Sequence, residues 1–159
     1  MGEAIIARRG GGAKFEEISG HIIPLAESDD YGNFINALTQ DDDYVYCGGY
    51  AIQKVWKIRK SDMTKVAESA NYGGTIGALI QDDEYIYCGW DTQTVWKIRK
   101  SNMSKVAESA SYGGGIRALT QDDEYIYCGG GTTGTDWKIW KIRKSDMTKV
   151  AESVSYGSL

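Results

Sequence analysis

One sequence unit is written three times between residues 31 and 155, and this repetition limits the folds open to the chain. Each copy runs from a Tyr-Gly pair through an acidic turn and a Tyr-x-Tyr-Cys-Gly segment to Trp-Lys-Ile-Arg-Lys and Ala-Glu-Ser. The residues Cys47, Cys88 and Cys128 are 41 and 40 positions apart. A period near 40 is typical of repeat architectures, in which each unit buries its apolar face against its neighbours.

The middle copy alternates short apolar runs with polar turns, which predicts four β-strands. The runs cover residues 76–80, 85–88, 94–99 and 105–109. β-branched and aromatic residues favour strands, whereas the recurring glycines disfavour helices. The fourth run is more polar, which suits an exposed sheet edge. We therefore expect an all-β chain of four-stranded antiparallel meanders, the pattern of propeller blades.

Two phrases of the repeat resemble those of a known family. They are Ile-x-Ala-Leu-x-x-Asp-Asp-x-Tyr-Ile-Tyr-Cys-Gly-Gly and Val-Trp-Lys-Ile-x-Lys-Ser-x-Met-x-Lys-Val-Ala. They resemble the repeats of quinoprotein-type (PQQ-like) β-propellers and, more loosely, WD-like and other propellers. The residues at 61–65 and 145–149 stand where that family has a Thr-Gly-Lys-like hairpin, but they lack its glycine. The resemblance implies a β-propeller; no quinone or metal motif matches, so we expect no cofactor.

The beginning of the chain looks like a degenerate fourth copy. Residues 26–28 match 67–69, Phe15 falls on Trp56, and residues 4–6 fall on 45–47. This copy has its second, third and fourth strands and lacks the first. We expect one domain over 1–159, with blades at about 1–31, 32–72, 73–112 and 113–156.

About four blades can close a propeller in two ways. One chain can curl into a small ring, or two chains can meet head to tail in a ring of about eight blades. Glycine-rich inner strands suit the wider ring, and the flat outer faces of the terminal blades would otherwise be large apolar patches. We therefore favour a homodimer with two-fold symmetry.

Composition excludes several classes of function. The chain has 159 residues with 18 basic and 22 acidic side chains, and no run of like charge resembles a nucleic-acid-binding arm. There is neither a membrane-spanning apolar stretch nor a signal peptide, so a cytoplasmic location is expected. The three cysteines share one repeat position, which indicates buried thiols and not disulfides or metal ligands. With His21 as the sole histidine, no catalytic arrangement repeats, and we expect no enzyme activity.

Charged and aromatic residues recur in register, and each set has two readings. The acidic turns at 41–43, 82–84 and 122–124 could bind Ca²⁺, but they lack the spacing of a calcium loop and suit turn formation better. The basic stripe at 57–65 and its copies could attract a polyanion, but the acidic residues interleaved with it favour a solvated, ion-paired edge. The repeated tryptophans and tyrosines could stack on sugars, but their strand positions favour a core between blades.

The copies disagree in the turns between their second and third strands. Trp90 replaces a glycine, Tyr50 lies in the matching turn of the first copy, and the third copy carries four extra residues. We therefore predict a ligand-binding rim; its residues are Tyr50, Trp90, Asp91, Asp136 and Trp137. The alternative is drift after duplication, with local loop packing only.

These observations predict a non-enzymatic binding module that assembles through its terminal blades and binds a protein or small ligand on one rim. A first alternative is a lectin-like propeller that binds carbohydrate through Trp and Tyr pockets. A second alternative is a fragment of a larger quinoprotein-like enzyme.

Overall fold

The computed structural model describes residues 14–18, 21–131 and 137–156, and the regular elements in these ranges are all β-strands. Twelve of the strands form three four-stranded antiparallel sheets, each built from consecutive strands. We call these sheets blades 1, 2 and 3. Blade 1 comprises β3 (Ile35–Gln40), β4 (Tyr44–Gly49), β5 (Trp56–Arg59) and β6 (Lys65–Glu68). Blade 2 comprises β7 (Ile76–Gln81), β8 (Tyr85–Trp90), β9 (Trp96–Arg99) and β10 (Lys105–Glu108). Blade 3 comprises β11 (Gly115–Gln121), β12 (Tyr125–Gly131), β13 (Ile139–Arg143) and β14 (Lys149–Glu152).

In each blade, a methionine takes the left-handed conformation in the turn between the third and fourth strands, where the resembling family has a glycine. Met63, Met103 and Met147 take the glycine position with φ of 56°, 56° and 58°, in the left-handed region that glycine normally occupies. The side chains of Met103 and Met147 are buried between blades. Burial of a large apolar side chain offsets the backbone strain at this position.

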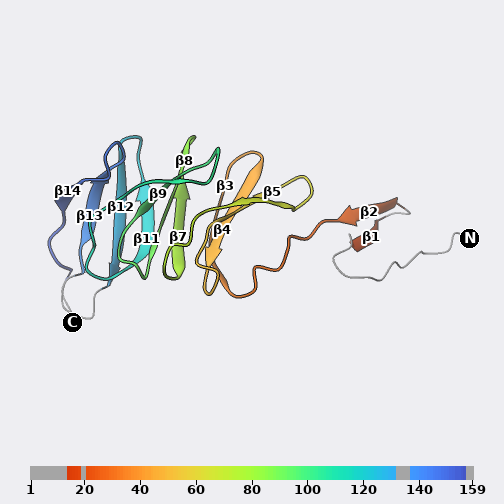
Figure 1. Cartoon of the computed structure of the whole chain (residues 1–159), viewed down its shortest axis with the longest axis horizontal. Helices are drawn as coiled ribbons and strands as arrows, with labels where there is room; N and C mark the ends of the chain where they lie inside the picture. Colours follow the sequence, from red (N-terminus) through yellow and green to blue (C-terminus); the bar gives the residue numbers. More distant parts are fainter. Residues whose placement is uncertain (1–13, 19–20, 132–136, 157–159) are drawn as a thin grey trace, which may run out of the picture.

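The blades stack face to face in chain order, so each junction between blades contains a hydrophobic core (Figure 1). The core between blades 1 and 2 includes Tyr46, Val55, Tyr72, Ile76, Leu79, Ile86 and Ile98. The core between blades 2 and 3 includes the matching residues Tyr87, Val95, Tyr112, Ile116, Ile126 and Ile142. The prediction that neighbouring copies cover one another is therefore confirmed.

The three cysteines are buried and free, as their shared repeat position predicts. Each lies on the second strand of its blade, and burial raises the pKa of Cys47 to about 11 and that of Cys128 to about 12. The thiols are therefore protonated at neutral pH and act as small apolar side chains.

The degenerate first copy contributes a two-stranded hairpin. Strand β1 (Lys14–Ile18) pairs with β2 (His21–Leu25) in antiparallel register. This hairpin stands apart from blade 1 in Figure 1. The second strand predicted at 4–6 lies outside the described residues. In the part of the chain that the structure describes, no helix has the length and apolar character needed to cross a membrane.

Candidate functional site

Each junction between blades is built around a glycine on one blade and an isoleucine on the next. Ile76 of blade 2 lies against Gly48 of blade 1, where an added Cβ would be 2.5 Å from the Ile76 Cγ2 atom. Ile116 of blade 3 lies against Gly89 of blade 2 at 3.0 Å by the same measure. Only glycine therefore lets two blades approach this closely. We call this contact the glycine notch.

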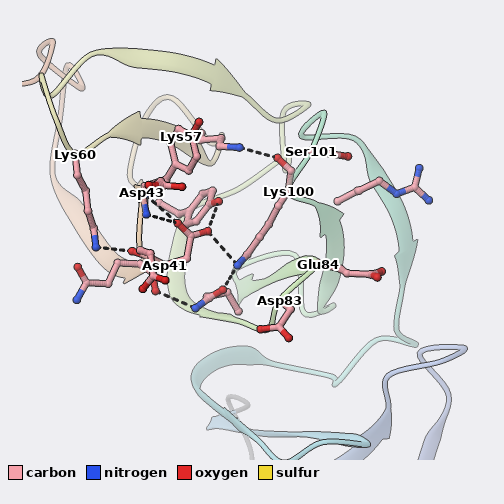
Figure 2. Close-up of a pocket in the computed structure, with 14 residues that line it drawn as sticks. Asp41, Asp43, Lys57, Lys60, Asp83, Glu84, Lys100 and Ser101 are labelled. Atoms are coloured by element: carbon pink, nitrogen blue, oxygen red, sulfur yellow. Dashed lines mark hydrogen bonds and ion pairs between the residues drawn. The ribbon is translucent and has the colours of Figure 1, made fainter.

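A polar clasp joins the same two blades at the end that carries the acidic turns (Figure 2). The Asp41 Oδ2 atom accepts a hydrogen bond from the Tyr46 hydroxyl at 2.8 Å and lies 3.1 Å from Lys100 Nζ of the next blade. Lys100 Nζ also donates to Gln81 Oε1. Lys57 of blade 1 completes the clasp by donating to the Lys100 carbonyl at 3.1 Å. The clasp thus joins blades 1 and 2 through side chains from both.

The second junction repeats this clasp. Asp82 Oδ2 accepts from the Tyr87 hydroxyl at 2.8 Å and lies 3.4 Å from Lys144 Nζ of blade 3. Lys97 Nζ donates to the Lys144 carbonyl at 2.8 Å. Each of the two junctions opens beside its clasp into a cleft of about 900 Å³. The clefts lie at the end of the blades that carries the acidic turns.

Two glutamines at the ends of the first strands of blades 2 and 3 also join neighbouring blades. The Gln81 side-chain amide donates to the Gln40 carbonyl of the preceding blade at 2.9 Å. Gln121 does the same to the Gln81 carbonyl at 2.6 Å. Each glutamine therefore bonds the backbone of the blade before it.

The first acid of each turn holds the turn together. Asp82 Oδ1 accepts the backbone N–H groups of Glu84 at 3.1 Å and Tyr85 at 2.9 Å. Asp41 and Asp122 accept the matching N–H groups of their own turns. Turn formation therefore explains the recurring first acid. Within the described residues, no group of three or more His, Cys, Asp or Glu side chains is arranged to hold a metal ion.

The clasp lowers the pKa of its carboxyl groups. Burial alone raises the pKa of Asp82, but the Tyr87 hydroxyl, two backbone N–H groups and Lys144 together bring it below its ordinary value. The balance at Asp41 is the same, with Tyr46 and Lys100 as the main stabilising partners. The carboxylates are thus ionised throughout the neutral range.

These depressed pKa values predict acid-sensitive stability. A carboxyl group whose folded pKa lies below its unfolded value of about 3.9 stabilises the fold above that pH, and the stability is lost as pH falls through the folded pKa. We expect the urea midpoint of unfolding to stay level from pH 7 to about 5 and to fall below about pH 4. Asp82→Asn should flatten this fall; an unchanged pH profile in that variant would show that Asp82 contributes nothing to it.

The expectation that the whole basic stripe is a solvated edge is wrong for the two clasp lysines. Lys100 and Lys144 are 8% and 9% exposed and lie inside the junctions. The outer residues of the stripe do form exposed ion pairs, such as Arg59 with Asp62 at 2.8 Å. Sequence reasoning missed the clasp because one repeated lysine looks like its solvated neighbours. The available signal was that this lysine and the first acid of each turn recur together in all three copies.

The repeated tryptophans are structural. Tyr31 packs edge-on against Trp56 with ring centroids 4.8 Å apart, and Lys65 Nζ lies 4.0 Å from the Trp56 ring centroid. Trp96 and Trp140 have the same two kinds of neighbour. Because a tyrosine and a lysine occupy each ring, these tryptophans serve packing, as the core interpretation predicts.

The predicted ligand-binding residues lie at the opposite end of the blades, in the turns between second and third strands. The Trp90 ring covers Gly77, where a Cβ would lie 1.9 Å from Trp90 Cε3, and the Arg117 guanidinium is 4.7 Å from the ring centroid. Asp91 accepts the backbone N–H of Thr75 at 3.2 Å.

The other predicted rim residues sit in the matching turns of blades 1 and 3. Tyr50 is 56% exposed, and Trp137 is 41% exposed with its ring over Gly131. Asp136 lies outside the described residues. The structure shows no contact that joins Tyr50, Trp90 and Trp137, so whether they form one site stays a prediction.

Comparison with solved structures identifies the architecture. The structure is similar to the computationally designed Ika4 protein, with a TM-score of 0.73 and 15% identity over 82% of this chain and 79% of that one. The fold is a β-propeller. The blades also match the RRP9 WD40 repeats, with a TM-score of 0.66 and 10% identity over 77% of this chain and 39% of that chain.

A third similar structure is Kuenenia stuttgartiensis hydrazine synthase, with a TM-score of 0.67 and 17% identity over 89% of this chain and 41% of that chain. At these identities the similarity concerns the propeller fold alone, and a specifically PQQ-like repeat is not shown. No protein-family model matches the sequence, and a search of curated proteins finds no match.

Proposed function

We propose that this propeller chain is a non-enzymatic interaction module that assembles with a second copy through the outer faces of its terminal blades. The observation that carries the proposal is a contrast between equivalent residues. Ile76 and Leu79 on the inner strand of blade 2 are 0% and 8% exposed, because blade 1 covers them. The matching Ile35 and Leu38 of blade 1 are 47% and 62% exposed. A propeller blade buries this face, so the terminal face is a binding surface.

The rim of Tyr50, Trp90, Asp91 and Trp137 is the part of this module that we propose for a protein or small ligand. Exposed aromatic side chains on turns of a rigid scaffold are suited to contact another molecule. The proposal of a non-enzymatic role rests on the positions of the polar groups. The clasp acids and lysines serve turns and junctions.

Thermal unfolding at several protein concentrations tests the assembly. Association stabilises the folded state by mass action, so the melting temperature should rise by several degrees over a hundredfold increase in concentration. Leu38→Asp should remove this dependence because it charges the terminal face without touching the internal junctions. A melting temperature of the unaltered chain that is independent of concentration over the whole range would count against assembly.

A lectin-like role is the second candidate. It is favoured by the exposure of Trp137 and Tyr50 on one rim, since indole and phenol faces can stack on sugar rings. A glycan array tests it, with binding expected to disappear in Trp90→Ala or Trp137→Ala. Absence of binding to every glycan would exclude this role and leave the interaction module.

A further inference from the structure

We infer that the outer face of blade 3 docks onto the outer face of blade 1 of a second copy, head to tail, in the register of the two junctions inside the chain. This inference rests on the proposed function and specifies its partner, surfaces and register. The internal junctions use four kinds of contact, and each terminal face carries one unmatched half of every kind.

The apolar halves are complementary. Gly48 and Gly89 each have an isoleucine of the next blade against them, whereas no atom lies within 4 Å of a Cβ built at the matching Gly129. At the other end, Ile35 occupies the position of Ile76 and Ile116 and is 47% exposed instead of 0%. Blade 3 thus presents an open glycine notch, and blade 1 presents the isoleucine that fits it.

The charged halves are complementary too. Asp122 accepts the Tyr127 hydroxyl at 2.7 Å, as the clasp acids Asp41 and Asp82 do with their tyrosines, but no lysine forms an ion pair with it among the described residues. Lys60 holds the position of Lys100 and Lys144. It donates to the Asp41 carbonyl of its own blade and has no carboxylate partner in the described ion pairs. Docking in register brings Lys60 of the second copy to Asp122 and completes a third clasp.

Two further contacts follow from the same register. Lys57 and Lys97 bond the carbonyl of the clasp lysine in the next blade. The matching Lys141 lies over the rings of Tyr125 and Tyr127 and near the Asp122 carboxylate, and among the described residues it bonds no such carbonyl. Among the described residues, Gln40 bonds no preceding blade and the Gln121 carbonyl receives no glutamine side chain, unlike the pairs at the two internal junctions. When blade 3 of one chain joins blade 1 of another in this register, Lys141 meets the Lys60 carbonyl and the Gln40 side chain meets the Gln121 carbonyl.

The degenerate first copy is a poorer occupant of this junction. At the repeat offset of 41, the notch position of that copy is Ala7 and its clasp-lysine position is Ser19. At the two internal notches, an added Cβ atom would lie only 2.5 and 3.0 Å from the isoleucine of the next blade. An alanine at the notch position would therefore crowd that isoleucine. The direct junction therefore gives a ring of six complete blades from two chains, within the usual range of four to eight, in place of about eight blades that include the degenerate copies.

Two blocked variants test the register. Ile35→Asp blocks the blade 1 face, and Gly129→Val blocks the blade 3 face; both positions are open in the single chain, so neither should disturb its fold. We expect each variant alone to be monomeric by analytical ultracentrifugation, because a head-to-tail contact needs one face of each kind. A one-to-one mixture should form a heterodimer through the one junction that remains unblocked.

The alternative outcomes are distinct. If the unaltered chain is monomeric, the proposed assembly itself fails. If the unaltered chain is oligomeric but either blocked variant alone remains oligomeric, or the mixture stays monomeric, assembly stands and the head-to-tail register is overturned. Circular dichroism of each variant confirms that it is folded before the mixture is read.

The clasp gives a second test in the same heterodimer. Asp122→Asn is placed in the chain blocked at Ile35, and Lys60→Met in the chain blocked at Gly129, so both changes face each other across one junction. Each change alone should weaken the heterodimer roughly 10- to 100-fold, because it leaves a partly buried charge unpaired. Both together should weaken it no more than the worse single change. Simple multiplication of the two effects would show that Lys60 and Asp122 do not meet.

Tyr156 provides the matched control. It occupies the repeat position of Tyr72 and Tyr112, yet it is 68% exposed because no tryptophan of a following blade is present. In the second copy Tyr31 already holds this place, with its hydroxyl bonded to the Lys54 carbonyl at 2.7 Å. We therefore expect Tyr156→Ala not to weaken the heterodimer. A clear weakening would contradict the junction as inferred, since it would place Tyr156 where Tyr31 belongs.

Discussion

Alanine at Gly48 will destabilise the single chain, whereas alanine at Gly129 will leave its stability unchanged and weaken its assembly. The two glycines hold the same repeat position, but only Gly48 has an isoleucine against it, 2.5 Å from an added Cβ. Overpacking of this kind costs about 1–3 kcal/mol. Neither glycine has a positive φ, so alanine introduces no backbone strain at either position.

Urea unfolding of the two variants at low concentration, where chains are apart, measures the first effect. The free energy of unfolding should fall by about 1–3 kcal/mol for Gly48→Ala and stay within about 0.5 kcal/mol for Gly129→Ala. Sedimentation at high concentration measures the second effect. Because the closed pair contains two such junctions, Gly129→Ala should raise the dissociation constant by twice the contact energy, roughly 30- to 25,000-fold. If Gly129→Ala assembles as tightly as the unaltered chain, the open notch is not part of the interface.

Among the substitutions considered for the single chain, removal of the Asp82 carboxylate is expected to lower the free energy of unfolding most. Asp82 accepts from the Tyr87 hydroxyl and from two backbone N–H groups of its turn, and it faces Lys144 across the junction at 3.4 Å. In Asp82→Ala the hydroxyl of the fully buried Tyr87 and the nearly buried ammonium of Lys144 both lose this partner. Breaking a fully buried charged pair costs about 3–5 kcal/mol; because the Asp82 side chain is 27% exposed, we expect a loss at the lower end, about 3 kcal/mol.

The neighbouring Asp83 is the control for this experiment. It lies in the same turn and is exposed, so Asp83→Ala should change the free energy of unfolding by less than about 0.5 kcal/mol. Both substitutions are best made in the Gly129→Ala background, so that assembly does not mask the loss. Equal stability of the two variants would mean that the clasp adds nothing to the junction between blades 2 and 3.

The sequence predicts the strands of this fold well because three copies repeat the same evidence. Apolar runs, acidic turns and Tyr-Gly pairs recur at one spacing, and the all-β meanders follow from them. The missing glycine of the hairpin at 61–65 was a visible departure, but sequence alone did not show that Met63 and its copies adopt the left-handed conformation. That solution depends on a buried pocket between blades, which exists only after the blades have stacked.

The junctions were harder to predict for a similar reason. Lys60, Lys100 and Lys144 have the same sequence surroundings. Lys100 and Lys144 are buried against the preceding blade, whereas Lys60 has no blade in front of it among the described residues. Their difference comes from position in the stack, which a repeat does not encode locally. In contrast, the exposed faces of the terminal blades were foreseeable, because a stack of similar units always leaves two ends uncovered. Which face meets which could be inferred only from the unmatched contacts.

The absolute mass of the unaltered chain, measured by light scattering over a dilution series, tests the central claim most directly. A head-to-tail pair that closes on itself predicts a mass of twice 17.5 kDa that does not grow as the concentration rises. A folded chain that remains at 17.5 kDa at every concentration would contradict the account.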